Sequence, residues 1–461
     1  MNAIVFSAIW GVVMMFTGLF VKNNKRVRYT AIAGLVILLL LNLLEMRGVR
    51  LFDIDVKRML SFESFGLLFN SIAFSCTLIY FVLSGRDIEQ VGLHVAEYFA
   101  LLFFILCGVS IASSFNTLLM LFLGIEIISI PLYILTGSDK RNLKSNEASL
   151  KYFLMGAFST GLMLMGIALI YGAKGSFVME EIALGSTVLT PMLSAGLLLL
   201  LFSMAFKVSA APFHFWNPDV YDGAPTVFTS FMATIVKATA FIAFLRLFEG
   251  SFGDMQFQWQ LPVAIITAAT LVIGNITAVF QQSVKRMLAY SSIAQAGFMM
   301  LALVALNGRA KEGLIFYATA YSLATIGVFA VLLKMKDYTF EGFNGLGKRE
   351  PILALANTIF LFSLAGIPAT AGFLGKFYML SATIANGKVL WLVILAICCA
   401  AISVYYYFRV IQAMYFKEGD GELALATTPV FKVTLLLLAL ALLILGLFPK
   451  LLLDNLYNPI Y

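Results

Sequence analysis

Charged residues, histidine and cysteine are scarce in this sequence. Only 12% of its 461 residues are Asp, Glu, Lys or Arg, whereas 61% are hydrophobic. A soluble protein of this length does not need so much apolar surface, so we expect a lipid bilayer to be the solvent. Backbone groups in a bilayer must be hydrogen-bonded within the protein, which leaves helix bundles or closed barrels. The apolar runs are continuous and do not alternate, so the sequence predicts an all-helical polytopic membrane protein.

The scarcity of histidine and cysteine limits the cofactors that the chain can hold. Two histidines, His94 and His214, are too few for a membrane cytochrome with two haems. The four cysteines lie in apolar segments and form neither a CxxC pair nor a metal-ligand spacing. No glycine-rich phosphate loop indicates the use of ATP. The net charge of +7 comes from basic residues in short loops, so we expect no nucleic-acid partner and no cofactor in this chain.

The apolar runs are long enough to cross a bilayer about fourteen times, because a helix needs roughly 20 residues to cross the hydrocarbon. The predicted spans are 3–21, 29–46, 62–83, 94–113, 115–136, 149–172, 191–210, 224–248, 261–280, 287–307, 312–334, 351–384, 389–413 and 430–449. The first run has no basic residue before it and no small-residue cleavage site after it. We therefore expect a retained span rather than a secretory signal.

The seventh and twelfth spans contain helix breakers. The seventh runs into Pro212 and Pro218, and the twelfth is interrupted at 364–368 by the sequence LAGIP. Proline lacks the backbone N–H and clashes with the preceding helical turn. A broken helix at membrane depth is tolerated only where it is buried in protein or lines a wet cavity. Each break therefore predicts a cavity.

The two broken spans stand five apart, and because five is an odd number, repeats at that offset would be inverted. Inverted repeats with broken helices are typical of transporters with a site near the midplane. We therefore predict two inverted five-helix repeats. The predicted division is 1–93 for helices 1–3, 94–250 for the first repeat, 251–415 for the second repeat and 416–461 for the last helix.

Basic residues are distributed unequally between alternate loops. Loops after odd-numbered spans hold sixteen Lys and Arg residues, and loops after even-numbered spans hold nine. Because cytoplasmic loops carry the excess of positive charge, we expect the odd-numbered loops in the cytoplasm and both termini on the outer side.

Four charged residues lie inside apolar spans: Glu126, Lys207, Lys237 and Lys376. A charge at the bilayer centre costs roughly 2.5–3.5 kcal/mol, and such residues usually mark ion or proton pathways. Burial favours the uncharged form of a lysine, whereas a neighbouring carboxylate favours the charged form. A movable Glu–Lys pair is therefore a plausible proton switch. The alternatives are a static ion pair for each charge and, for Lys207, snorkelling to the interface.

Four further residues are candidates for a supporting role. Tyr317 and Tyr321 share one face of the eleventh span, where their hydroxyls would relay protons or form interhelical hydrogen bonds. His214, at the end of the seventh span, is a proton carrier or a structural histidine. Lys151 starts the sixth span, where snorkelling and a functional role are equally open.

Four motifs resemble those of the antiporter-like membrane subunits of respiratory complex I, the proton-translocating NADH:quinone oxidoreductase. The long one is FKVSAAPFHFWNPDVYDGAP at 206–225. The others are GNITAV at 274–279, KRMLAYSSIAQAG at 285–297 and AGIPATAGFLGKFY at 365–378. The resemblance covers nearly the whole chain. Within the family it is nearest to the subunit N branch, because the chain lacks a long lateral helix and has a lysine in the twelfth span and tyrosines in the eleventh.

The resemblance implies a role for each buried charge. Glu126 would pair with Lys207 and modulate its protonation, Lys237 would bridge along the central axis, and Lys376 would mark the exit toward the outside. Lys151 resembles a lysine of the sixth helix in the family. NADH, FMN, iron–sulfur clusters and quinone would be bound by partner subunits, both membrane and hydrophilic ones, in a bacterial inner membrane.

Two other functions remain open from the sequence. The chain would be a component of an Mrp-type Na⁺/H⁺ antiporter, a relative that shares the fold, or a structural membrane scaffold whose lysines only hold ion pairs.

Overall fold

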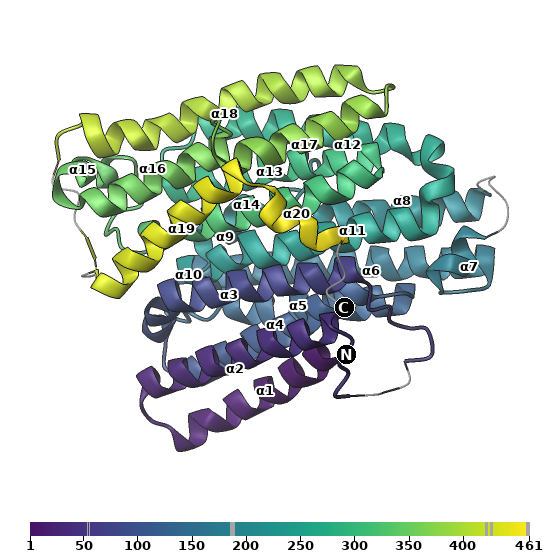
Figure 1. The fold of residues 1–461 in the computed structure, drawn as a ribbon, viewed down its shortest axis with the longest axis horizontal. Helices are drawn as coiled ribbons and strands as arrows, with labels where there is room; N and C mark the ends of the chain where they lie inside the picture. The colour runs from purple at the N-terminus through teal and green to yellow at the C-terminus, as the bar shows by residue number, and fades with distance from the viewer. Residues whose placement is uncertain (53, 55, 185–189, 420–422, 425–426, 458–461) are drawn as a thin grey trace.

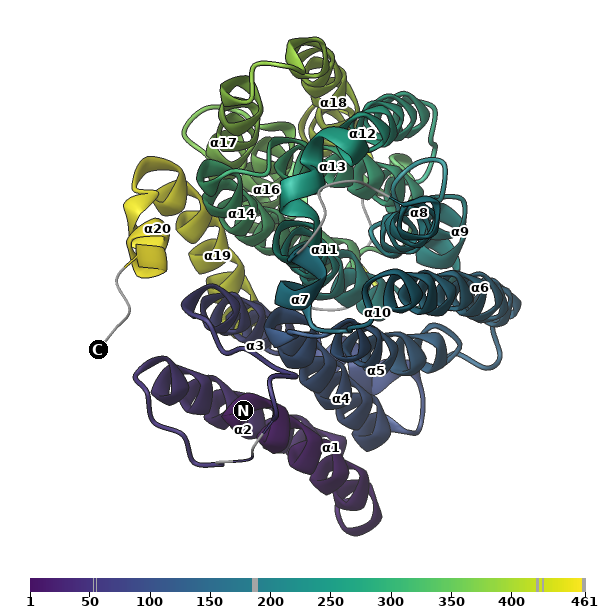
Figure 2. The same ribbon diagram turned by 90° about the vertical axis from the view of Figure 1, so that its right-hand side faces the viewer.

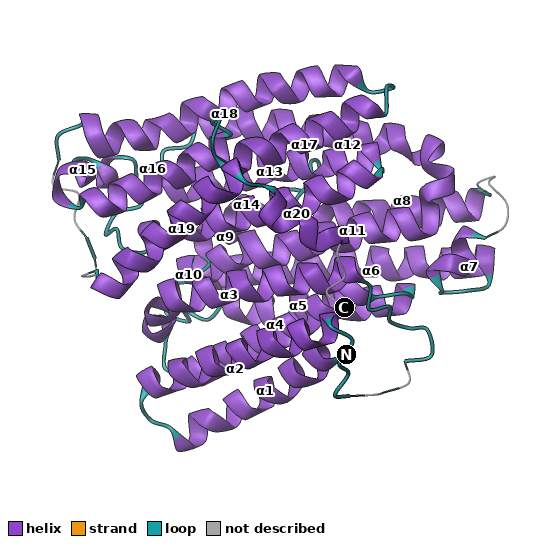
Figure 3. Ribbon diagram, viewed as in Figure 1, coloured by secondary structure: helices purple, strands orange, loops and turns teal. Residues whose placement is uncertain are grey.

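The computed structural model describes residues 1–461 except 53, 55, 185–189, 420–422, 425–426 and 458–461. Within that part the chain is almost entirely helical and has no strand (Figure 3). The predicted all-helical fold class is therefore confirmed.

The longest connections between helices are 47–63, between α2 and α3, and 417–428, between α18 and α19. The N-terminal ones are α1 (Asn2–Phe20), α2 (Asn24–Met46), α3 (Ser64–Val91), α4 (Val95–Ser114), α5 (Leu118–Thr136), α6 (Leu143–Lys174) and α7 (Met179–Ala183). The middle ones are α8 (Pro191–Lys207), α9 (Trp216–Gly223), α10 (Thr226–Phe231), the π-helical turn η1 (Met232–Val236), α11 (Lys237–Phe252), the 3-10 turn η2 (Gly253–Met255), α12 (Gln256–Val279), α13 (Val284–Ala305) and α14 (Gly308–Leu332). The C-terminal ones are the 3-10 turn η3 (Glu341–Phe343), α15 (Leu346–Arg349), α16 (Pro351–Ala365), α17 (Ala371–Ala385), α18 (Leu390–Phe416), α19 (Pro429–Leu447) and α20 (Lys450–Tyr457).

The long helices run roughly parallel or antiparallel to one another in one bundle (Figure 1). Seen along their axes, the α1–α2 hairpin lies at one side and α18 at the opposite side (Figure 2). α13 and α14 lie in the interior. In an apolar stretch of 18 residues, 94% of the residues of α13 and 100% of those of α14 are buried, whereas only 22% are buried in α1. A helix that is apolar all round is buried by its neighbours. Polar side chains on α13 and α14 are therefore shielded from lipid.

Eleven segments of the described chain are long and apolar enough to cross a membrane. One of them, Thr226–Val279, contains two predicted spans, and the broken spans appear as the shorter apolar helices Pro191–Lys207 and Pro351–Ala365. Every predicted span overlaps helix. The number of fourteen crossings, the inverted repeats and the division at 93, 250 and 415 stay predictions.

The predicted break in the seventh span is confirmed between α8 and α9. The helix ends at Lys207, Ser209 adopts a left-handed φ of 62°, and the Ala211–Pro212 bond is cis. The last carbonyls of a helix have no intrahelical partner. Here the indole N–H of Trp216 donates to the Phe206 carbonyl at 3.1 Å. The helix thus ends inside the bundle, and at least one of its terminal carbonyl groups has a hydrogen-bond donor.

The predicted break in the twelfth span is confirmed between α16 and α17. Gly366 follows α16 with a φ of 86°, and Ala369 follows Pro368 with a φ of 70°. Glycine adopts this left-handed conformation without steric cost. The start of the second half-helix lies against the end of the first, since the Gly372 amide donates to the Ser363 hydroxyl at 3.1 Å.

The close approach of α16 and α17 at Gly372 makes this position intolerant of a side chain. A Cβ at Gly372 would overlap the carbonyl oxygen of Ser363. We expect Gly372→Ala to destabilise the protein by about 1–3 kcal/mol through overpacking. Gly161, on the exposed side of α6 with no atom near its virtual Cβ, provides the control Gly161→Ala. The midpoint of thermal unfolding in detergent should fall for the first variant only; equal midpoints would contradict the close packing.

Candidate functional site

The first buried charges, Glu126 on α5 and Lys207 at the end of α8, form an ion pair. Lys207 Nζ lies 3.7 Å from Glu126 Oε1 and donates to Ser129 Oγ at 2.9 Å. Thr160 of α6 donates to Glu126 Oε1 at 2.7 Å. A separation of 3.7 Å is longer than a tight charge-assisted hydrogen bond, so the pair is close and still able to part. The predicted pairing of these two residues is therefore seen in the structure.

A small cavity adjoins Lys207. It has about 30 Å³ for water centres and is lined by side chains that include Ser129, Tyr152, Lys207 and Thr239. A cavity needs roughly 10–15 Å³ of such volume to hold one water molecule. The cavity beside the first break is therefore confirmed, and it extends from Lys207 to the helix that carries Lys237.

Lys237 is the first residue of α11 and follows the π-helical turn η1. Its side chain is 2% exposed, and Nζ donates to the carbonyl and to the hydroxyl of Ser292 at 3.1 and 2.9 Å. The Tyr221 ring lies 5.7 Å from the ammonium. π-Turns often occur at functional sites. This π-turn interrupts the regular helical period directly before Lys237.

Lys376 lies in the second turn of α17 and points back to the end of α16. Nζ donates to the carbonyl oxygens of Leu364 and Ala365, both at 2.9 Å, and the Phe298 ring lies 4.8 Å away. A cation is stabilised by the partial negative charge at a helix C-terminus. The second break therefore supplies the acceptors for this lysine.

Lys237 and Lys376 share one arrangement: two oxygen acceptors, one aromatic ring and no carboxylate, since no ion pair of the described residues includes either lysine. A neutral amine has two N–H donors, and an ammonium has a third. Two acceptors satisfy the neutral form, and the aromatic face attracts the charged form. Each site therefore accommodates both protonation states without a buried counter-ion.

Polar side chains of α13 lie between these two lysines. Ser292 contacts Lys237, and one turn later the Gln295 amide donates to the Leu364 carbonyl at 2.9 Å, the same oxygen that accepts from Lys376. Tyr317 of α14 donates to the Gln295 amide oxygen, and the Gln295 amide also donates to Tyr407 at 3.0 Å. Ser292 and Gln295, one helical turn apart on α13, thus place polar groups beside Lys237 and beside the carbonyl that accepts from Lys376.

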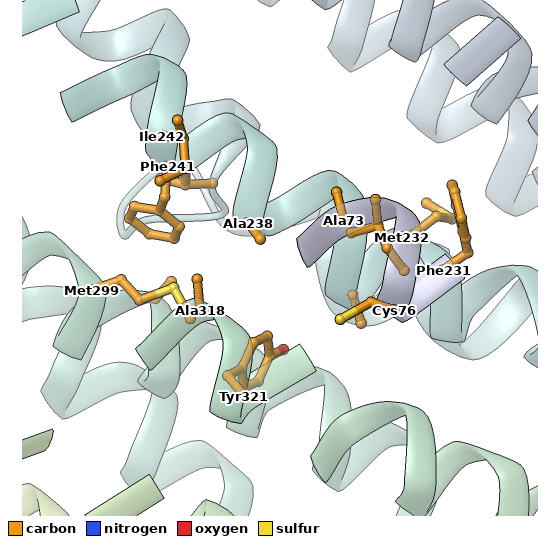
Figure 4. Close-up of a cluster of buried hydrophobic side chains, with 14 of the residues drawn as sticks. Ala73, Cys76, Phe231, Met232, Ala238, Phe241, Ile242, Met299, Ala318 and Tyr321 are labelled. Carbon is orange, nitrogen blue, oxygen red and sulfur yellow. The ribbon is translucent and has the colours of Figure 1, made fainter. Parts of the chain in front are cut away.

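Tyr321 of α14 is also buried in the interior of the bundle. Figure 4 shows it at a cluster of apolar side chains that includes Cys76 and Ala318. Within the described part of the chain, its hydroxyl and that of Thr325 make no hydrogen bond. A buried hydroxyl without a partner is costly, and it marks a place where a water molecule would be stabilised.

The other supporting residues lie apart from this connection. Lys151 is 42% exposed and pairs with Glu147 at 2.7 Å and with Asp219 at 3.0 Å, in a surface cluster that also contains Arg286. His214 lies in the first break with its Nδ1 unpaired among the described residues. The structure therefore pairs Glu126 with Lys207 and places Tyr317 beside the Lys376 site through Gln295, whereas Lys151 lies in a charged cluster at the surface of the protein.

Ser292, Gln295 and Asn217 were missed by the sequence analysis as site residues. The Asn217 amide donates to Ser292 Oγ at 3.3 Å and accepts from Ser209 at 3.2 Å, which links the first break to Lys237. The available signal was a Ser–x–x–Gln spacing within an apolar helix, because such a spacing places both polar groups on one helix face. No group of three or more His, Cys, Asp and Glu suited to a metal ion is present among the residues that the structure describes.

The family model described as "NADH:quinone oxidoreductase/Mrp antiporter, TM" matches residues 115–403, a range that includes all four buried charges. The chain belongs to this family. The relative from Cytophaga hutchinsonii, named NADH-quinone oxidoreductase subunit N, is 41% identical over 98% of this chain and 99% of its own length. The resemblance that the motifs predicted is therefore confirmed.

Solved structures agree with this assignment. A chain of the structure "Respiratory complex I from Thermus thermophilus with bound Aureothin" is 32% identical, with a TM-score of 0.85 over 98% of this chain and 99% of that one. A chain of the Mrp complex from Dietzia sp. DQ12-45-1b also has a TM-score of 0.85, at 19% identity over 99% and 96% of the two chains. The second likeness shows a common fold.

The connection through Gln295 predicts a stability effect. Gln295→Met keeps the length of the side chain and leaves the buried Tyr317 hydroxyl without its acceptor, so we expect a loss of about 1–3 kcal/mol in the free energy of unfolding. Gln282→Met, at an exposed position after α12, is the matched control. Detergent-solubilised protein should show a lower midpoint of thermal unfolding for the first variant alone. A midpoint unchanged by Gln295→Met would mean that the hydrogen bonds to this residue contribute nothing.

Proposed function

We propose that this chain is a proton-translocating subunit, of the subunit N type, in the membrane arm of NADH:quinone oxidoreductase. The observation that supports this most directly is the charge row, by which we mean Glu126, Lys207, Lys237 and Lys376. Its members are held by groups that satisfy more than one protonation state, and hydroxyls, amides and a cavity lie between them. The chain thereby contributes to an oxidoreductase complex as its ion-moving part.

The proposed transfer begins at the Glu126–Lys207 pair. When the pair parts, the carboxylate no longer stabilises the ammonium, and Lys207 releases its proton toward the cavity and Lys237. Lys237 then carries the charge, and its protonation disfavours a second charge on Lys207 by repulsion. The hydroxyl groups of Ser292, Tyr321 and Tyr317 pass the proton toward Lys376, which releases it on the far side. Gln295 orients Tyr317 by accepting its hydrogen bond.

Electron transfer in this proposal takes place in other subunits. NADH, FMN, iron–sulfur clusters and quinone belong to those partners, which include hydrophilic and membrane subunits of the complex. The chain spans a bacterial inner membrane with both termini on the outer side, as the excess of Lys and Arg in odd-numbered loops predicts. Electrostatic contact along the axis would transmit the redox event to Glu126 and Lys207.

An Mrp-type cation/proton antiporter is the second candidate, because the family description and the fold likeness include it. The sequence identities favour the complex I function. They are 41% to the subunit N relative and 32% to the complex I chain, against 19% to the Mrp chain. The antiporter function predicts Na⁺-dependent proton movement in the absence of NADH.

Substitution of Lys207 tests the proposed role in proton translocation. In membranes that carry Lys207→Ala, we expect NADH-driven proton pumping and quinone reduction to fall together by about tenfold or more, since a positioned proton carrier contributes roughly 10²–10⁴ in rate. Lys140→Ala, at an exposed loop position, should leave both rates unchanged. A native gel stained for NADH dehydrogenase activity establishes that each variant comigrates with the assembled complex.

Two results would contradict the proposal. Normal pumping by an assembled Lys207→Ala complex would exclude this role for Lys207, and normal pumping by the double variant Glu126→Gln, Lys207→Met would favour a structural scaffold. Migration of the chain in a smaller complex without NADH dehydrogenase activity would favour the antiporter.

A further inference from the structure

A crevice outside the charge row lies between α2, α3 and α19, near the end of α14. It has a volume of about 260 Å³ and lies at one end of the bundle. Figures 1 and 2 show α19 and the α1–α2 hairpin on the same flank, with α3 between them. The Lys and Arg distribution predicts this end to be the cytoplasmic one.

Three cations line the crevice: Arg28 of α2, Arg86 of α3 and Lys334 after α14. Two of them are compensated, because Arg28 pairs with Glu89 at 2.7 Å and Lys334 pairs with Asp87 at 2.7 Å. Arg86 is exposed and forms no ion pair with any residue that the structure describes. The rim of the crevice therefore has one uncompensated positive charge.

The start of α19 adds to this positive potential. Thr428 caps the helix by accepting a hydrogen bond from the Phe431 amide at 3.3 Å, and Pro429 occupies the first turn. Both Thr427 and Thr428 line the crevice. The N-terminus of a helix carries a partial positive charge that favours anions. The mouth of the crevice thus combines guanidinium, hydroxyl and helix-end groups suited to a phosphate.

Apolar side chains form the deeper walls. Ile32 lies four residues after Arg28 on α2, and Val82 lies four residues before Arg86 on α3. Four helical residues correspond to about 6 Å along the axis. α2 starts and α3 ends at this end of the bundle. On both helices, therefore, the basic residue lies at the end of the bundle and the apolar residue lies one turn deeper. Val82 and Val430 are 41% and 67% exposed, so the apolar walls open at the surface of the bundle.

We propose that this crevice binds the headgroup of an anionic phospholipid, with its phosphate at Arg86 and the α19 N-terminus and its acyl chains along Ile32 and Val82. Basic pockets between transmembrane helices on the cytoplasmic side suit such headgroups. The apolar walls distinguish a phospholipid from free phosphate, because an inorganic anion gains nothing from them. The bound lipid would join the N-terminal hairpin to α3 and α19.

The test uses the intact purified complex after removal of lipid with detergent. Vesicles of phosphatidylcholine with phosphatidylglycerol are added, and the midpoint of thermal unfolding is followed against the phosphatidylglycerol concentration. We expect an upward shift that Arg86→Gln moves to about fivefold higher lipid concentration, as expected for one basic residue near a membrane surface. Arg141→Gln, which removes an exposed arginine at the same predicted face, should behave as the unsubstituted complex.

Further conditions distinguish a phospholipid headgroup from free phosphate as the ligand. Phosphatidylcholine vesicles alone and inorganic phosphate alone should give no shift, and Arg86→Lys should retain most of the response. An equal response of Arg86→Gln and Arg141→Gln would overturn the site. A full shift with inorganic phosphate would overturn the lipid as its ligand.

Discussion

Every buried charge of this protein must find its partners inside the bundle, because the surrounding lipid offers none. The four members of the charge row meet this constraint in different ways. Glu126 and Lys207 satisfy one another with help from Ser129 and Thr160. Lys237 and Lys376 instead rest on backbone and hydroxyl oxygens with an aromatic ring nearby. The first arrangement stabilises separated charges, whereas the second tolerates a change of protonation state.

The helix breaks follow from the same constraint. The carbonyl groups in the last turn of a helix have no intrahelical partner, so they are free to accept hydrogen bonds from a buried ammonium. The end of α16 supplies two such carbonyls to Lys376, and the end of α8 places Lys207 beside a cavity and within reach of Glu126. The breaks cost backbone hydrogen bonds, which Trp216 and Ser363 partly replace. The interrupted spans thus supply acceptors for Lys376 and a position beside a cavity for Lys207, whereas Lys237 is held by the continuous helix α13.

Much of this arrangement was predictable from the sequence. Continuous apolar runs with proline breaks indicate a helical membrane protein. Glu126 and Lys207 stand out in these runs because a charge inside a membrane span is costly and usually functional. Ser292 and Gln295 do not stand out, because serine and glutamine are common in membrane helices and only the packing of α13 against α11 and α17 makes them bridges. The π-turn before Lys237 was also hidden, since a sequence pattern assumes a regular period. For Lys151 the sequence left snorkelling and a functional role equally open, and the structure places it on α6 in a surface ion cluster with Glu147 and Asp219.

In the proposed function the charge row acts as one proton path. Its midpoint is Lys237, which forms no ion pair with a carboxylate of the described chain. The most direct measurement compares proteoliposomes that contain the complex with Lys237→Met and without it, and records NADH oxidation and proton uptake with and without an uncoupler. The account predicts that both rates fall and that the uncoupler does not restore NADH oxidation, because the block lies in the transfer itself and not in an opposing gradient. Unsubstituted rates of oxidation and proton uptake in the fully assembled variant would contradict it.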